Sequence, residues 1–221
     1  MNTSNNYVKQ MSSNIIRTIQ NLLRDSYTYN GGFTILKELI QNANDAHASN
    51  FKILFNEGIK NASHPLLKMP AILIYDDGDF TEDNEIGIAD IAGENKTDDD
   101  TKIGRYGLGM KSVFHLCDLF FYAGYRENKN GDTSFVIGAV NPWKIEARPE
   151  YAEFTDEDVK LFQKAIPSEC FEKKKGFLLW LPAKESKPEI QNYNISEQEV
   201  DSNNPFGAPV LLKNQFSYII S

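Results

Sequence analysis

The stretch ELIQNANDA, residues 38–46, mixes acidic, amide and apolar side chains at helical spacing. Glu38, Asn42 and Asp45 stand at positions i, i+4 and i+7, which share one stripe of a 3.6-residue helix. Two carboxylates and an amide that point the same way can address one ligand, and the alternative is a solvated polar face. The flanking apolar surface comes from Leu36, Leu39, Ile40, Ala43 and Ala46.

A glycine-rich turn, GRYGLGMKS at residues 104–112, is the second candidate site. Glycines let backbone N–H groups approach a ligand, and the start of the following helix adds partial positive charge, so the turn suits an anion. The alternative is a tight connection. Met110 separates Gly109 from Lys111 and puts the lysine out of register for a Walker motif, and the order G-x-x-G-x-G does not match the dinucleotide or kinase loops.

Both segments need a scaffold of helices and strands. Strand-like segments rich in branched and aromatic residues alternate with apolar-periodic helices, without regular β-α-β order. We therefore predict an α/β (α+β) two-layer sandwich, in which helices cover one face of a mixed, mostly antiparallel sheet. The expected helices are 15–23, 33–48, 81–91 and 155–166, with Ser13, Thr81 and Thr155 as candidate caps, and the expected strands are 51–56, 71–75, 119–125, 134–140 and 177–182.

Composition narrows the class of protein. The 221 residues carry a net charge of −8, which argues against binding to nucleic acid or to an anionic membrane. The spacing of Cys117, Cys170 and the three histidines does not fit a metal site. No apolar run is long enough to span a membrane and the N-terminus lacks a signal-peptide pattern, so we predict a cytoplasmic location.

Four segments, in this order, resemble the GHKL ATPase superfamily, which has the Bergerat ATP-binding fold. They are YNGGFTILKELIQNANDAHAS, IYDDGDFTEDNEIGI, KIGRYGLGMKSVFHLCD and KKGFLLWLP. The resemblance is closest to the sacsin and NO VEIN type of N-terminal ATPase domain. It covers roughly residues 14–182 and implies an ATP-binding domain over 1–182, followed by a polar linker and the start of a further segment over 183–221.

The resemblance implies roles for the acidic and amide residues. Glu38 would polarise the attacking water as a general base, and Asn42 would coordinate Mg²⁺ through its amide oxygen. Asp45 would lie near the ribose. Asp76 would accept a hydrogen bond from the adenine amino group, and Gly78 would let the backbone pass close to the ring.

The resemblance also assigns the phosphates of ATP or ADP to the glycine-rich turn. Its members there are Gly104, Gly107, Leu108, Gly109 and Ser112. Lys102 or Lys111 could add a cation, with plain solvent exposure as the alternative for each. The charged segment GENKTDDDTK, residues 93–102, would form a lid over the nucleotide.

Two positions depart from the superfamily pattern. Phe80 stands where many members have a second glycine, as it also does in sacsin-like domains. Phe177 follows Gly176 where relatives usually have a threonine that helps to bind adenine through water. The missing hydroxyl predicts either lower affinity or looser recognition of the base.

The function that this resemblance implies is an ATP-binding, slowly hydrolysing module of a larger protein. Lid closure would change its pairing with a downstream domain or with a second copy, and hydrolysis should be weak without a basic residue from that downstream domain. The alternatives are a nucleotide-gated interaction module without significant hydrolysis and, less favoured, a histidine-kinase-like phosphotransferase. Sacsin-like relatives are associated with chaperone-type work, and a role in bacterial defence is a second possibility.

Overall fold

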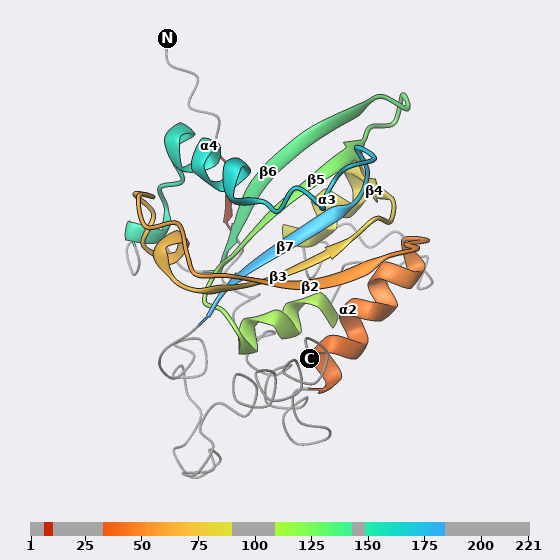
Figure 1. Ribbon diagram of the computed structural model, residues 1–221. Coiled ribbons are helices and arrows are strands. Elements are labelled where there is room, and N and C mark those ends of the chain that lie inside the picture. The colour runs from red at the N-terminus through yellow and green to blue at the C-terminus, as the bar shows by residue number, and fades with distance from the viewer. Residues whose placement is uncertain (1–6, 11–32, 90–108, 143–148, 184–221) are drawn as a thin grey trace.

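The computed structural model describes residues 7–10, 33–89, 109–142 and 149–183, and one sheet dominates this part of the chain (Figure 1). The sheet has seven strands in the order β1-β6-β5-β7-β3-β2, and β4 pairs with the end of β5. The strands are β1 (Val8–Gln10), β2 (Phe51–Asn56), β3 (Ala71–Asp76), β4 (Phe80–Thr81), β5 (Phe120–Glu127), β6 (Thr133–Asn141) and β7 (Phe177–Pro182).

Strand pairing is mixed and mostly antiparallel, as the sequence predicts. Strand β1 runs parallel to β6 and β4 runs parallel to β5, whereas the other neighbours are antiparallel. Strands β3 and β7 lie between other strands, and nearly all of their side chains are buried. Such strands read as continuous apolar runs rather than as an alternating pattern.

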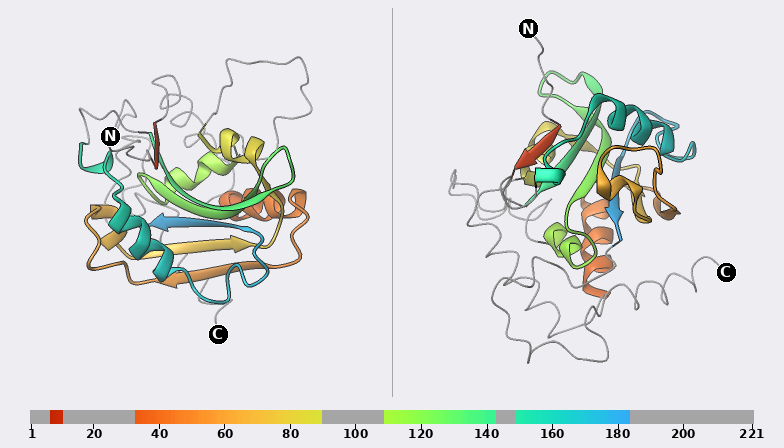
Figure 2. Two further views of the ribbon diagram at one scale, coloured as in Figure 1. Left: turned by 90° about the horizontal axis from the view of Figure 1, so that it is seen from above. Right: turned by 90° about the vertical axis from the view of Figure 1, so that its left-hand side faces the viewer.

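Helical elements cover both faces of the sheet, with the longest described helix, α2, on the first face and α4 on part of the second (Figure 2). On the first face, α2 and η3 lie side by side and α3 is nearby. Neighbouring residues of strand β7 contact the elements on the two faces. Leu179 lines the cavity beside α2, whereas Trp180 packs against Phe162 of α4, with ring centroids 5.1 Å apart. The first-face elements are α2 (Phe33–Asp45), α3 (Glu82–Ala89) and η3 (Gly109–His115), and the second-face elements are α4 (Asp156–Ala165), η1 (Pro65–Lys68) and η4 (Pro149–Tyr151).

The predicted fold class is therefore confirmed, and the covered second face is an addition to it. Leu178 and Trp180 are fully buried on that face. The aromatic contacts there join Trp180, Phe162 and Phe121.

Local signals set the helix ends. At α4, Thr155 Oγ1 accepts the Asp158 N–H at 3.1 Å, and the Asp158 carboxylate accepts the Thr155 N–H. The two hydrogen bonds form a capping box. Thr81 and Asn84 exchange the same pair of bonds at the start of α3. Helix α2 ends in a Schellman motif, in which Ala48 N–H donates to the Ala43 carbonyl and His47 adopts a φ of 58°.

Some expected elements lie outside the described residues. These are the helix at 15–23, the segment 93–102 and all but the first residue of the segment 183–221. Within the described part, η3 is a 3₁₀ helix over residues that the sequence predicts to be helical. Cys117 and Cys170 are both buried and not in a disulfide.

Candidate nucleotide site

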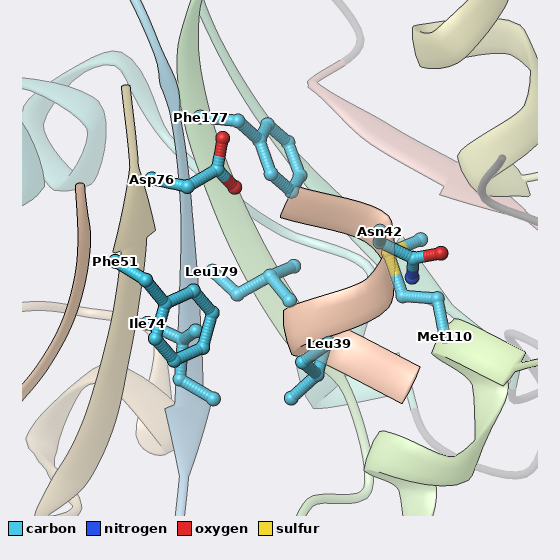
Figure 3. Close-up of a pocket in the computed structure, with 8 residues that line it drawn as sticks. All are labelled: Leu39, Asn42, Phe51, Ile74, Asp76, Met110, Phe177 and Leu179. Carbon is cyan, nitrogen blue, oxygen red and sulfur yellow. The ribbon is translucent and has the colours of Figure 1, made fainter. Parts of the chain in front are cut away.

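A small cavity lies between the first face of the sheet and the helices α2 and η3 (Figure 3). Its volume is about 10 Å³, which is room for about one water molecule. Each of the four conspicuous sequence segments contributes to its wall. The lining residues are Leu39, Asn42, Phe51, Ile74, Asp76, Met110, Phe177 and Leu179.

Helix α2 brings one of its three polar stripe residues to the cavity. Asn42 is buried and lines the cavity beside Leu39. Glu38, one turn earlier, is half-buried and is not among the lining residues, and Asp45 is exposed. Of the three stripe residues, only Asn42 therefore lines the cavity, and Asp45 at the end of the helix faces solvent.

Asp76 ends strand β3, which lies between β7 and β2, with its carboxylate at the cavity. The side chain is 8% exposed, and Oδ1 accepts the Gly78 N–H at 2.9 Å. In Figure 3 the carboxylate points toward the ring of Phe177 and the helix α2. Asp76 is the acidic side chain among the eight that line the cavity, so it supplies the strongest hydrogen-bond acceptor there.

Gly78 holds the turn after β3 against the end of α2. A Cβ atom at this position would lie 2.6 Å from Ala46 Cβ and 2.8 Å from Asp76 Oδ1. The Asp79 N–H also donates to the Ala46 carbonyl at 2.7 Å. The close approach that requires a glycine here is therefore to the helix and to the Asp76 carboxylate.

Asp77 fixes the same turn from the other side, a role that the sequence did not reveal. Its Oδ1 accepts the backbone N–H groups of Ser49 and Asn50, each at 2.7 Å, and its Oδ2 accepts the Asn50 amide at 2.8 Å. Burial acts to raise the pKa of Asp77, but the hydrogen bonds from Asn50 and Ser49 outweigh it and leave the pKa lowered.

The glycine-rich turn is described only from Gly109 onward. Met110 lines the cavity, and Ser112 of η3 is buried. Lys111 belongs to η3, but its side chain lies outside the described part of the structure. The predicted contacts Lys102, Gly104, Gly107 and Leu108 also lie outside it.

The two residues that depart from the superfamily pattern touch one another. The rings of Phe80 and Phe177 lie 4.7 Å apart, and the Tyr122 ring lies 6.1 Å from Phe177. Glycines make room for these rings, because a Cβ at Gly124 would lie 2.7 Å from Phe80 and a Cβ at Gly138 would lie 2.5 Å from Tyr122. Phe177 is therefore held firmly in the cavity wall.

A buried carboxylate, Glu85 of α3, anchors Tyr122. Glu85 accepts a hydrogen bond from the Tyr122 hydroxyl at 2.8 Å and forms ion pairs with Lys9 and Arg126. Burial acts to raise the pKa of Glu85, but hydrogen bonds from Lys9, Arg126 and Tyr122 lower it overall. The cluster ties β1, α3 and β5 together behind the aromatic wall.

The family model of the sacsin domain matches residues 12–137, which is more than half of the chain. The chain belongs to the sacsin domain family. The match covers α2, β2, β3, α3, η3 and β5, and so it includes Asn42, Asp76 and Met110. Phe177 and Leu179 on β7 lie beyond the matched range.

Human sacsin is a similar protein, 35% identical to this chain over 116 residues. The aligned part is 50% of this chain and 2% of human sacsin, so this sacsin domain corresponds to a small piece of that relative. In the part of the chain that the structure describes, no helix is both long enough and apolar enough to cross a membrane.

Proposed function

We propose that this sacsin domain is a GHKL-type, Bergerat-fold module that binds ATP with Mg²⁺ and hydrolyses it slowly. The observation that carries the proposal is the cavity, where residues from four separate sequence segments surround the carboxylate of Asp76. Apolar walls with a few convergent polar groups are the usual lining of a small-ligand site, and a base would enter this cavity, which has room for about one water molecule, by widening it. Apolar residues there would bury the base, and Asp76 would accept a hydrogen bond from the adenine amino group.

Asn42 and Glu38 provide the chemistry for the phosphate end. Asn42 offers an amide oxygen, a hard ligand that suits Mg²⁺ together with phosphate and water oxygens. Glu38 lies one helical turn away and is half-buried. A carboxylate at that distance can orient a water molecule for attack on the γ-phosphate and accept its proton.

The wider role extends the proposal to the whole protein. In it, the domain is one module of a larger multidomain protein, residues 93–102 close over the nucleotide, and closure changes contacts with a downstream domain or a second copy. Chaperone-type work and bacterial defence are both compatible with this description. The alternative function is a gated interaction module that binds ATP without turnover, and the retained acid at Glu38 favours hydrolysis.

The substitution Glu38→Gln separates binding from hydrolysis. Glutamine keeps the size of the side chain and removes the base, so Mg-ATP should still bind while phosphate release falls by roughly a hundredfold or more. The measurement is calorimetric titration with phosphate release on the same samples, and Glu57→Gln, an exposed acid on a loop, is the matched control.

Each other outcome has a distinct meaning. Binding without phosphate release in the unchanged protein would favour the gated interaction module. Phosphate release that is unaffected by Glu38→Gln would show that the hydrolysis does not occur at this site.

A further inference from the structure

Three neighbouring strands place an aromatic ring on each side of the Asp76 carboxylate. Asp76 of β3 pairs in register with Phe51 of β2 and with Phe177 of β7. Residues directly opposite one another on antiparallel strands share a face of the sheet, and all three of these line the cavity. Figure 3 shows the two rings and the carboxylate facing the same space.

Phe51, Asp76 and Phe177 form a row across the three strands, and the spacing of this row suits a planar ring. Strands in a sheet lie about 4.8 Å apart, so the backbones of Phe51 and Phe177 are separated by roughly 10 Å. A flat base in contact with a ring on each side needs roughly 7 to 8 Å between the two rings. Asp76 would then meet the edge of the base, where an exocyclic amino group can donate a hydrogen bond.

The row is the fixed side of the cavity. Backbone pairing holds all three residues, and Phe177 is also packed against Phe80, with ring centroids 4.7 Å apart. The opposite wall consists of Leu39, Asn42 and Met110 on α2 and η3. Because the cavity holds only about one water molecule, a base would enter by displacing this wall, where Met110 is the most adaptable side chain.

We propose that Phe51 and Phe177 form an aromatic slot that selects purine nucleotides by stacking, while Asp76 between them recognises an exocyclic amino group. This inference rests on the proposed nucleotide-binding function and adds a determinant of specificity to it. It assigns a base-stacking role to Phe51, and the same role to Phe177 at the position where the resembled superfamily usually has threonine.

A comparison of ATP with CTP tests the slot. Both nucleotides carry a triphosphate and an exocyclic amino group, but the purine has the larger stacking surface. The unchanged protein should prefer ATP, and Phe51→Leu and Phe177→Leu should each weaken ATP binding about tenfold and reduce the preference over CTP. Phe51→Tyr, which keeps an aromatic ring, should retain both.

Phe55→Leu is the matched control, because Phe55 lies on the same strand, is 52% exposed and is not among the cavity-lining residues. Thermal unfolding of each variant shows whether it folds. If Phe177→Leu does not fold, the test rests on Phe51→Leu, because Phe51 is only half-buried and its substitution should be tolerated. A drop in the adenine absorbance on binding, smaller in Phe51→Leu, is the spectroscopic sign of stacking.

The outcomes distinguish a failure of the aromatic slot from a failure of the proposed nucleotide-binding function. If the unchanged protein binds ATP but Phe51→Leu and Phe177→Leu keep its affinity and its ATP-to-CTP preference, the slot is wrong and the nucleotide site stands. If the unchanged protein binds neither nucleotide, both proposals are overturned.

Discussion

Gly78 is a residue whose substitution should disturb the wall of the cavity, because it packs against both α2 and Asp76. A methyl group there would meet Ala46 and the Asp76 carboxylate at less than 3 Å, so Gly78→Ala must push α2 away from the turn. We expect a loss of about 1 to 3 kcal/mol in the free energy of unfolding and weaker ATP binding. Chemical denaturation and calorimetric titration measure the two effects.

Gly131→Ala is the control for this substitution, because nothing lies within 4 Å of a Cβ at Gly131. Its φ of 84° is strained for alanine, so some stability is lost, but ATP binding should not change. Equal ATP affinity in the two variants would contradict the role given to Gly78.

Helical spacing singled out Asn42 and the family resemblance singled out Asp76, and the two lie in one cavity although 34 positions separate them in the sequence. Their roles in binding nucleotide remain predictions. Phe51, Ile74 and Leu179 could not be recognised in advance, because an apolar strand residue acquires a function only through the register of its neighbours. Asp77 and Glu85 escaped notice for the same reason, since their partners come from distant segments.

At the scale of elements, the end of α2 carries an unfavourable backbone conformation. His47 has a φ of 58° at the position where Schellman motifs usually have glycine. His47→Gly should therefore increase the free energy of unfolding by about 0.5 to 1 kcal/mol, as measured by urea denaturation. Unchanged or lower stability would show that the imidazole makes a compensating interaction.

Elements with strong local signals were predictable. The strands at 51–56 and 177–182 have the expected bounds, and Thr155 caps α4 as expected. Helix α2 stops at Asp45, three residues before the predicted end, because the Schellman motif closes it. The covering of the second face by α4 was not predictable, since it depends on contacts such as that between Phe162 and Trp180.

At the scale of the whole molecule, one face of the sheet carries the cavity with Asp76 and Asn42, and the other face carries a buried histidine. His64 is 2% exposed, lies 5.0 Å from the Phe121 ring, and accepts the Leu66 N–H through Nδ1. Burial lowers the pKa of His64 to about 4, although the nearby Asp158 carboxylate acts in the opposite direction. The folded protein therefore favours the neutral imidazole.

This burial predicts a pH-dependent stability. In the unfolded chain the pKa of His64 is near 6.5, so the stability is fully present above that pH and is lost as the pH falls toward 4. Between pH 6.5 and about pH 5, the free energy of unfolding should fall by about 1.5 kcal/mol. His64→Asn keeps an acceptor for Leu66 and removes the titration, so a similar decline in that variant would contradict the prediction.

The central claim is that Asp76 reads a nucleotide base, and titration of Mg-ATP into the unchanged protein and into Asp76→Asn tests it most directly. The asparagine side chain can still accept a hydrogen bond from the Gly78 N–H. Its NH₂ group, however, would then face the amino group of adenine, and two donors cannot form a hydrogen bond. Asp79→Asn is the control, because Asp79 pairs with Lys175 at 2.9 Å and is not a cavity-lining residue. We predict saturable binding that only Asp76→Asn abolishes, whereas no ATP or ADP binding by the unchanged protein, or full binding by Asp76→Asn, would contradict the claim.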